Sequence, residues 1–140
     1  MKNKFYTPKI EEFHVGFEYE SYNGKVWSKE ISETCYSDQA YICLPIPEKD
    51  YGYDYENTRV KYLDLEDIES LGWKFKEIEK GMLSNRPIFK FKTYLLNFDR
   101  NEHGIWLLIT DEYVEYQHFS GQVKNKSELK KLMQMLNIEK

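Results

Sequence analysis

Regular alternation of apolar and polar side chains near the N-terminus is the feature that most constrains the fold. From Phe13 to Tyr19 every second residue is apolar, which predicts a half-buried β-strand over residues 10–20. The Asn23-Gly24 dipeptide that follows is typical of a tight type I′ turn. Residues 25–29 have the pattern of a return strand. The sequence therefore predicts an antiparallel hairpin here.

Further segments with strand character follow, and they are joined by short turns rather than by crossover helices. They are residues 40–44, 58–62, 73–76, 87–91, 93–98, 105–110 and 112–119. Residues 99–104 are polar and predict the loop of a second hairpin. Residues 105–109 are the most apolar run of the chain, which predicts a central strand covered on both faces.

Two helices are predicted from their capping residues. Asp64, with Asp67 three residues on, resembles a capping box ahead of a short helix over residues 65–71, which Gly72 would end. Asn125 caps a C-terminal helix with an apolar stripe that should pack on the sheet: Leu129, Leu132, Met133 and Leu136. The order of elements predicts a single α+β domain over residues 1–140, mainly an antiparallel sheet of about six or seven strands.

Composition excludes several classes of function. The 24 acidic and 20 basic side chains give a net charge of −4, so no broad positive field would attract a nucleic acid polymer. No stretch has the apolar length of a membrane span, and we expect a cytoplasmic protein. Cys35 and Cys43 match no compact metal or redox spacing; reduced thiols are the default expectation, although a hairpin could pair them.

Candidate catalytic groups are sparse. His14, His103 and His118 are far apart in sequence and form no metal-binding spacing, so we expect no metal, no cofactor and no enzyme activity. The remaining enzymatic hypothesis is a hydrolase in which His14 or His118 works with a glutamate of a neighbouring strand. No glycine-rich loop for phosphate is present.

The segment from Asp50 to Glu56 is the best candidate for a contact surface. It holds Tyr51, Tyr53 and Tyr55 among carboxylates and a glycine, a composition that suits a turn packed by its own rings or a binding surface. Cationic contacts could come from Arg59 and Arg86, because guanidinium groups match phosphate oxygens. These five residues are the predicted ligand-binding set. Trp27, Trp73 and Trp106 lie in predicted strands and are expected in the core.

Three segments resemble small uncharacterised proteins of phages and mobile elements of Bacteroidetes. They are KIEEFHVGFEYE at residues 9–20, VKYLDLEDIESLGW at residues 60–73 and VKNKSEL at residues 123–129. The resemblance carries no assigned site residues. It implies a small accessory protein in the cytosol of the host cell, and such proteins often block a host pathway, for example by sequestering a nucleotide immune signal.

Two functional hypotheses follow from the residues and the resemblance. The first is a non-enzymatic binding protein that sequesters a small nucleotide-like ligand through the tyrosines and arginines named above. The second is a protein-interaction module that inhibits a host enzyme or belongs to the virion, with the same tyrosines as its contact patch. Either protein could be a homo-oligomer, because small domains often build pockets between subunits.

Overall fold

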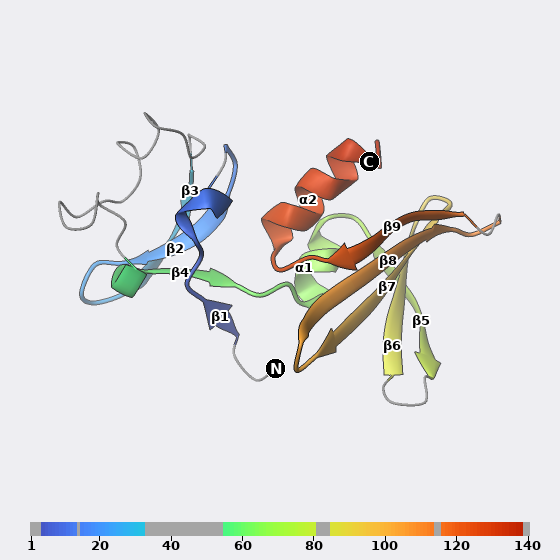
Figure 1. Cartoon of the computed structure of the whole chain (residues 1–140), viewed down its shortest axis with the longest axis horizontal. Helices are drawn as coiled ribbons and strands as arrows, with labels where there is room; N and C mark the ends of the chain where they lie inside the picture. The colour runs from blue at the N-terminus through green and yellow to red at the C-terminus, as the bar shows by residue number, and fades with distance from the viewer. Residues whose placement is uncertain (1–3, 14, 33–54, 81–84, 114–115, 139–140) are drawn as a thin grey trace. The chain divides into compact units, whose positions relative to one another are not determined.

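The computed structural model describes residues 4–13, 15–32, 55–80, 85–113 and 116–138 (Figure 1). The chain divides into two compact units, residues 3–62 and residues 63–140 with the first two residues. The described residues form antiparallel sheets of four and five strands and two α-helices, so the predicted α+β class with mainly antiparallel sheet is confirmed. The single domain over residues 1–140 stays a prediction, and each unit is described by itself below.

The first unit contains the four-stranded sheet, whose strands are not in sequence order. The order is β1 (Phe5–Tyr6), β4 (Thr58–Lys61), β2 (Glu18–Tyr22) and β3 (Trp27–Ile31), and each neighbouring pair is antiparallel. Short 3-10 helices cover Ile10–Glu12 and Tyr55–Asn57. Because β4 lies between β1 and β2, residues far apart in sequence meet on this sheet.

The predicted first strand is wrong at its start. Residues 10–12 form a 3-10 helix, and Gly16 adopts a φ of 88° that interrupts an extended chain. Val15, next to it, is 67% exposed instead of buried. The other three apolar residues of the alternating pattern still pack together: Phe13, Phe17 and Tyr19 have ring centroids 4.9 to 6.4 Å apart.

The predicted hairpin is present, with a different turn. Strands β2 and β3 pair from Glu18 opposite Ile31 to Tyr22 opposite Trp27, so four residues connect them rather than two. The Asn23 side chain closes this loop by accepting hydrogen bonds from the backbone N–H groups of residues 25 and 26. The backbone N–H of Asn23 also donates to the Val26 carbonyl at 3.3 Å, so Gly24 and Lys25 lie at the centre of the turn instead of the predicted Asn23 and Gly24.

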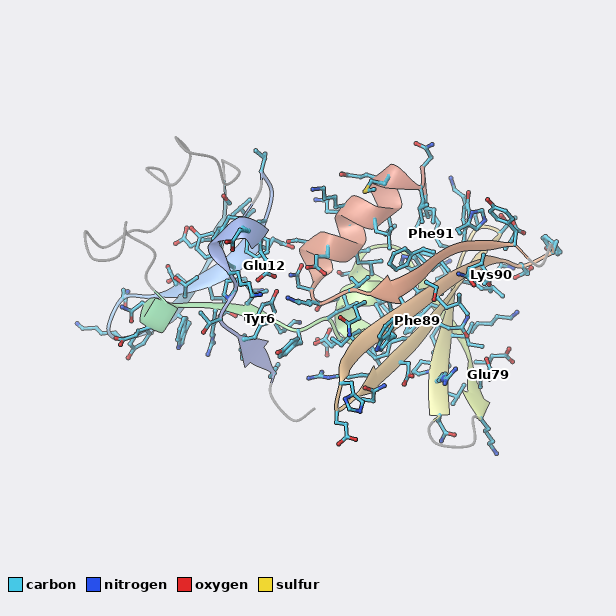
Figure 2. All side chains as sticks on the ribbon, in the orientation of Figure 1. Tyr6, Glu12, Glu79, Phe89, Lys90 and Phe91 are labelled. Atoms are coloured by element: carbon cyan, nitrogen blue, oxygen red, sulfur yellow. The ribbon has the colours of Figure 1, made fainter. Side chains whose placement is uncertain are left out.

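Among the described residues of the first unit, a buried apolar cluster consists of Phe13, Phe17 and Val60, with Tyr6 and Tyr19 packed against them. The Tyr6 hydroxyl donates a hydrogen bond of 2.8 Å to Glu12 Oε1, and the two side chains face each other (Figure 2). Burial, followed by the nearby carboxylate of Glu30, raises the pKa of Tyr19.

The second unit contains a five-stranded antiparallel meander. Its strands are β5 (Lys74–Lys80), β6 (Asn85–Phe91), β7 (Tyr94–Asn101), β8 (Gly104–Asp111) and β9 (Gln117–Gln122), side by side in sequence order. The predicted polar loop at 99–104 is wrong in length, because β7 and β8 pair as far as Asn101 opposite Gly104. Only two residues are left for the turn. The last strand starts five residues later than predicted, and the predicted strand at 40–44 lies outside the described residues.

One face of this sheet forms the main core. The pairings place Phe89, Leu96 and Ile109 side by side on that face, and all three are fully buried. The opposite face is not covered in the way predicted for β8, since Trp106 is 43% exposed. Its partners across the strands are the polar residues Asp99 and Gln122. Strand β8 is therefore central in the sheet yet buried on one face only.

Both predicted helices are confirmed. Helix α1 (Leu65–Ser70) starts with the Asp64 and Asp67 capping box, and Gly72 after it has a φ of 104°. Helix α2 (Lys126–Met135) is capped by Asn125, which accepts from Glu128 N. Among the described residues no helix is long and apolar enough to cross a membrane.

Helix α2 packs on the buried face of the five-stranded sheet. Trp73, which precedes β5, donates from Nε1 to Met133 Sδ at 3.3 Å, and its ring lies 5.6 Å from that of Phe91 on the same face. Leu129 and Met133 are buried, and Leu132 and Leu136 are half-buried. The predicted stripe therefore faces the core, as does Trp73.

Candidate ligand-binding face

The predicted ligand-binding set is placed only in part. Tyr51 and Tyr53 lie outside the described residues, and Tyr55 begins a 3-10 helix in which its side chain is not described. Arg59 lies on β4 of the first unit, and Arg86 lies on β6 of the second. The two arginines are therefore separate candidates, each judged by its own surroundings.

Arg59 lies on the outer face of the four-stranded sheet, opposite to the face that covers Phe13 and Phe17. Cross-strand partners share a face, and the register places Glu20 opposite Arg59, Lys61 opposite Phe5 and Trp27 opposite Tyr22. We call this surface the arginine face. It comprises Phe5, Glu18, Glu20, Tyr22, Trp27, Lys29, Ile31, Arg59 and Lys61.

The guanidinium of Arg59 is held by two aromatic rings and a carboxylate. Its central carbon lies 3.7 Å from the ring centroid of Phe5 and 4.1 Å from that of Trp27. Phe5 belongs to β1 and Trp27 to β3, on opposite sides of β4 in the sheet, so the guanidinium lies between their rings. Glu20 Oε1 accepts a hydrogen bond from Arg59 Nη2 at 3.1 Å. The side chain is thus fixed in one orientation by groups from β1, β2 and β3.

The row of planar groups continues beyond Trp27. The ring of Tyr22 lies 5.1 Å from that of Trp27 at an interplanar angle of 33°. Tyr22 is 36% exposed, and the Arg59 side chain is 28% exposed. A planar ligand could therefore reach this row without displacing a packed core, and rings of this kind stack on nucleobases.

The charges of the arginine face favour an anion weakly. Arg59, Lys29 and Lys61 carry positive charge, and Glu18 and Glu20 carry negative charge, a balance of three to two. Lys29 lies opposite Glu20 and is exposed. An excess of one positive charge beside stacked rings suits a small phosphate-bearing ligand better than the many phosphates of a nucleic acid polymer.

Arg59 was predictable from the sequence as a candidate, but the partners that surround it were not. Trp27 was predicted to lie in the core, and it is instead half-buried on the outer face. The sequence did contain a signal: Trp27 lies between Lys25 and Lys29 at alternate positions, which marks a polar strand face. Phe5 and Glu20 come from other strands, and no local pattern links them to Arg59.

Arg86 has different surroundings. Its Nε lies 3.8 Å from Asp99 Oδ2 across β6 and β7, and its side chain is 49% exposed. In the described part of the chain, aromatic rings contact the guanidinium of Arg59 but not that of Arg86. An exposed pair at this distance is held weakly. Arg86 is therefore the weaker candidate for a preorganised site.

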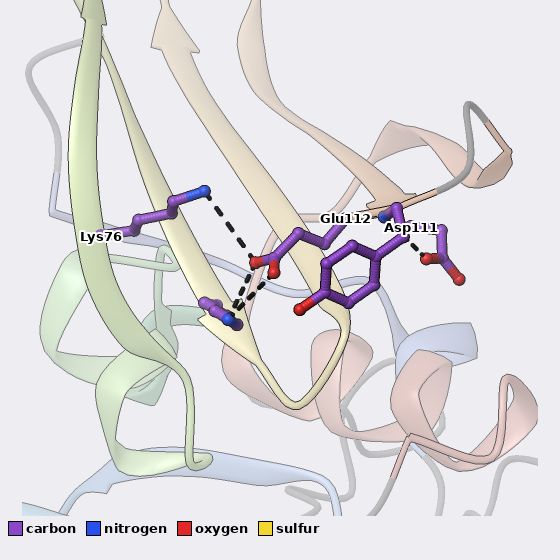
Figure 3. Close-up of polar contacts among 5 residues, drawn as sticks. Lys76, Asp111 and Glu112 are labelled. Carbon is purple, nitrogen blue, oxygen red and sulfur yellow. Dashed lines mark hydrogen bonds and ion pairs between the residues drawn. The ribbon is translucent and has the colours of Figure 1, made fainter.

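A second polar cluster lies at the end of the five-stranded sheet. Lys90 Nζ lies 2.9 Å from Glu112 Oε2, and Lys76 Nζ lies 3.9 Å from the same oxygen (Figure 3). The hydrogen bond from Lys90, followed by one from Tyr113, lowers the pKa of Glu112, and the same contact raises the pKa of Lys90. One carboxylate is thus shared by two lysines, and we interpret the cluster as a structural ion-pair network.

The histidines offer little support for a hydrolase. His118 Nε2 lies 3.8 Å from Asp111 Oδ2, beyond the range of proton transfer, and its ring is flanked by Tyr94 and Tyr116. His118 therefore has an aspartate neighbour rather than the predicted glutamate. His103 is 81% exposed, as a loop residue should be. His14 lies outside the described residues.

No group of three or more potential metal ligands occurs among the residues that the structure describes. The arginine face therefore remains the best-defined candidate site of the described chain. Comparison with known proteins adds no further assignment: no family model, no curated protein and no solved structure matches this chain.

Proposed function

We propose that this protein binds a small nucleotide-like ligand on the arginine face and does not alter it chemically. The observation that carries the proposal is the Arg59 guanidinium, fixed between Phe5 and Trp27 on an accessible sheet surface. Preorganised side chains bind with a smaller entropic cost than mobile ones. The tyrosines at 51, 53 and 55 remain part of the proposal as additional stacking groups.

Each part of the face has a role in this proposal. A base stacks on the exposed side of the row formed by Trp27 and Tyr22, where each stacked base contributes about 1–3 kcal/mol. A phosphate lies near Arg59 and Lys29, where charge-assisted hydrogen bonds fix its position. Glu20 keeps the guanidinium oriented and prevents a net positive charge large enough to attract polymeric nucleic acid.

The proposed biological role is counter-defence in the host cytosol. The resemblance of three segments to small phage proteins supports an accessory role, and a binder that leaves its ligand unaltered would act by sequestration. A nucleotide immune signal held on the arginine face would be withdrawn from its host receptor. This role requires that the ligand be a nucleotide, so it is excluded if the arginine face binds no nucleotide.

A thermal-shift screen tests the proposal. The purified chain is heated with a panel of cyclic dinucleotides and ADP-ribose derivatives, and the expected result is a higher melting temperature with one class of ligand. Trp27→Ala and Arg59→Ala should remove the shift. Trp106→Ala and Arg86→Ala are matched controls, because they remove the same side-chain types from the other sheet, and they should retain it.

Two results would contradict the proposal. One is the absence of a shift with every member of the panel, together with no co-purified ligand by mass spectrometry. The other is a shift that Trp27→Ala and Arg59→Ala preserve, because the ligand would then bind elsewhere. A pull-down from host lysate would in either case test the alternative of a protein target.

A further inference from the structure

Within the described part of the chain, strand β5 forms an open edge of the five-stranded sheet. Of the described strands it pairs only with β6, and all seven of its residues are exposed. Figure 1 shows β5 at one end of the sheet, next to β6. The outer edge of such a strand presents backbone N–H and C=O groups, which can pair with another strand.

The edge also exposes two large apolar side chains. Phe75 is 52% exposed and Ile78 is 54% exposed. Phe75 lies opposite the buried Phe89, with ring centroids 5.9 Å apart, and Ile78 lies opposite Pro87 two residues earlier on β6. Both therefore lie on the core face of the sheet, and they extend its apolar surface to the free edge.

A register shift explains why residues three apart share this face. Between Phe75 and Glu77 the pairing with β6 skips one residue, so the normal alternation is displaced by one. Lys74 and Glu79 lie opposite Lys90 and Arg86, on the other face. The strand thus has an apolar pair on one face and charges of both signs on the other.

These residues are complementary to a second copy of the same strand. In an antiparallel pair that sets Phe75 opposite Ile78 of the second copy, Lys74 faces Glu79 and Lys76 faces Glu77. Two-fold symmetry makes each contact occur twice. Shifting the register by one residue in either direction sets Phe75 against Glu79 or Glu77, and sets like charges, Glu77 or Lys76, against themselves.

We propose that β5 pairs with β5 of a second copy of this chain and joins two five-stranded sheets into one continuous sheet. Charged residues on an edge usually prevent such pairing because they meet partners of the same sign. On β5 the charges instead favour one register of the two strands. In that register the exposed Phe75 of each copy is covered by Ile78 of the other copy. The pairing uses no residue of the arginine face.

Charge reversal at the edge tests this proposal without disturbing the core. Sedimentation equilibrium should show a dimer for the unmodified chain. Lys74→Glu alone and Glu79→Lys alone each set like charges opposite one another, and each should weaken dimerisation by about tenfold or more. The double variant Lys74→Glu, Glu79→Lys should restore it, and so should an equal mixture of the two single variants.

The mixture is the most informative sample, because each chain in it dimerises only weakly with copies of itself. Recovery of the dimer on mixing would show that each single variant is folded and that residues 74 and 79 face each other. A monomer at every concentration for the unmodified chain would overturn the proposal. So would a dimer that both single variants retain, or a mixture that stays monomeric.

Discussion

Two arginines that sequence patterns mark as equivalent have unequal surroundings in the two sheets. Arg59 lies between two aromatic rings and 3.1 Å from Glu20, with 28% of its side chain exposed. Arg86 lies 3.8 Å from Asp99, with 49% of its side chain exposed. The difference shows that a positively charged side chain forms a preorganised binding site where neighbouring groups fix its orientation. For Arg59, these groups come from strands distant in sequence.

Replacing each arginine in turn should produce the largest difference in stability loss between the two sheets. Arg59→Met is expected to lower the free energy of unfolding by about 1–3 kcal/mol, because contacts with two rings and a half-buried carboxylate are lost. Arg86→Met should change it by no more than about 0.5 kcal/mol. Urea denaturation followed by circular dichroism measures both, and equal losses would remove the distinction.

A conservative change at the same position should have an intermediate effect. Arg59→Lys retains the positive charge beside Glu20 but loses the flat guanidinium that contacts Phe5 and Trp27. We expect a loss of about 1 kcal/mol in unfolding free energy, measured by the same denaturation. A value as large as that of Arg59→Met would mean that charge contributes nothing, and no loss at all would mean that stacking contributes nothing.

The ion pair of Lys90 and Glu112 provides a comparison from the second sheet, because its contribution to the unfolding free energy depends on pH. The pKa of Glu112 is lowered from 4.5, so its contribution to stability is complete above that pH and is lost as the pH falls through its folded pKa. The pKa of Lys90 is raised from 10.5, so its contribution persists below that pH and is lost as the pH rises further. The loss of unfolding free energy when this ion pair is broken should be smaller than the loss caused by Arg59→Met.

Glu112→Gln tests this reasoning. The variant should be less stable than the unmodified chain at neutral pH, and the two unfolding free energies should converge as the pH is lowered below 4.5. Urea denaturation at a series of pH values gives the comparison. A difference that does not depend on pH would assign the loss to packing rather than to charge.

The smallest expected effect concerns salt. About 1 M sodium chloride screens exposed charges almost completely, so Asp99→Asn should become indistinguishable in stability from the unmodified chain. The deficit of Arg59→Met should largely persist, because contact with two rings is less sensitive to screening. Denaturation curves at low and high salt distinguish these outcomes. If Arg59→Met became as stable as the unmodified chain at high salt, Arg59 would contribute to stability only as an exposed charge, as Arg86 does.

Local features of the fold were predictable because they depend on neighbours in the chain. The helix caps at Asp64 and Asn125 and the glycine after α1 each involve residues within four positions, and the structure confirms them. The four-residue loop after Tyr22 was not predicted, because the strand pairing places Gly24 and Lys25, rather than Asn23 and Gly24, at its centre.

Non-local features could not be read from such patterns. The contact of Arg59 with Glu20 joins residues 39 positions apart, and it exists because β4 inserts between β1 and β2. Trp106 lies in the most apolar run of the chain and yet is 43% exposed, since its strand neighbours on that face are polar. The division into two sheets likewise follows from pairings that alternation alone does not specify.

The three tryptophans allow one direct measurement of the central claim, that the arginine face binds a nucleotide. Each indole N–H gives a separate signal in a heteronuclear NMR spectrum, and Trp73 and Trp106 lie outside the arginine face. On titration with cyclic dinucleotides and with ADP-ribose, the Trp27 signal should shift with one of these ligands and the other two should stay in place. No movement of Trp27 with any of them, or equal movement of all three signals, would contradict the claim.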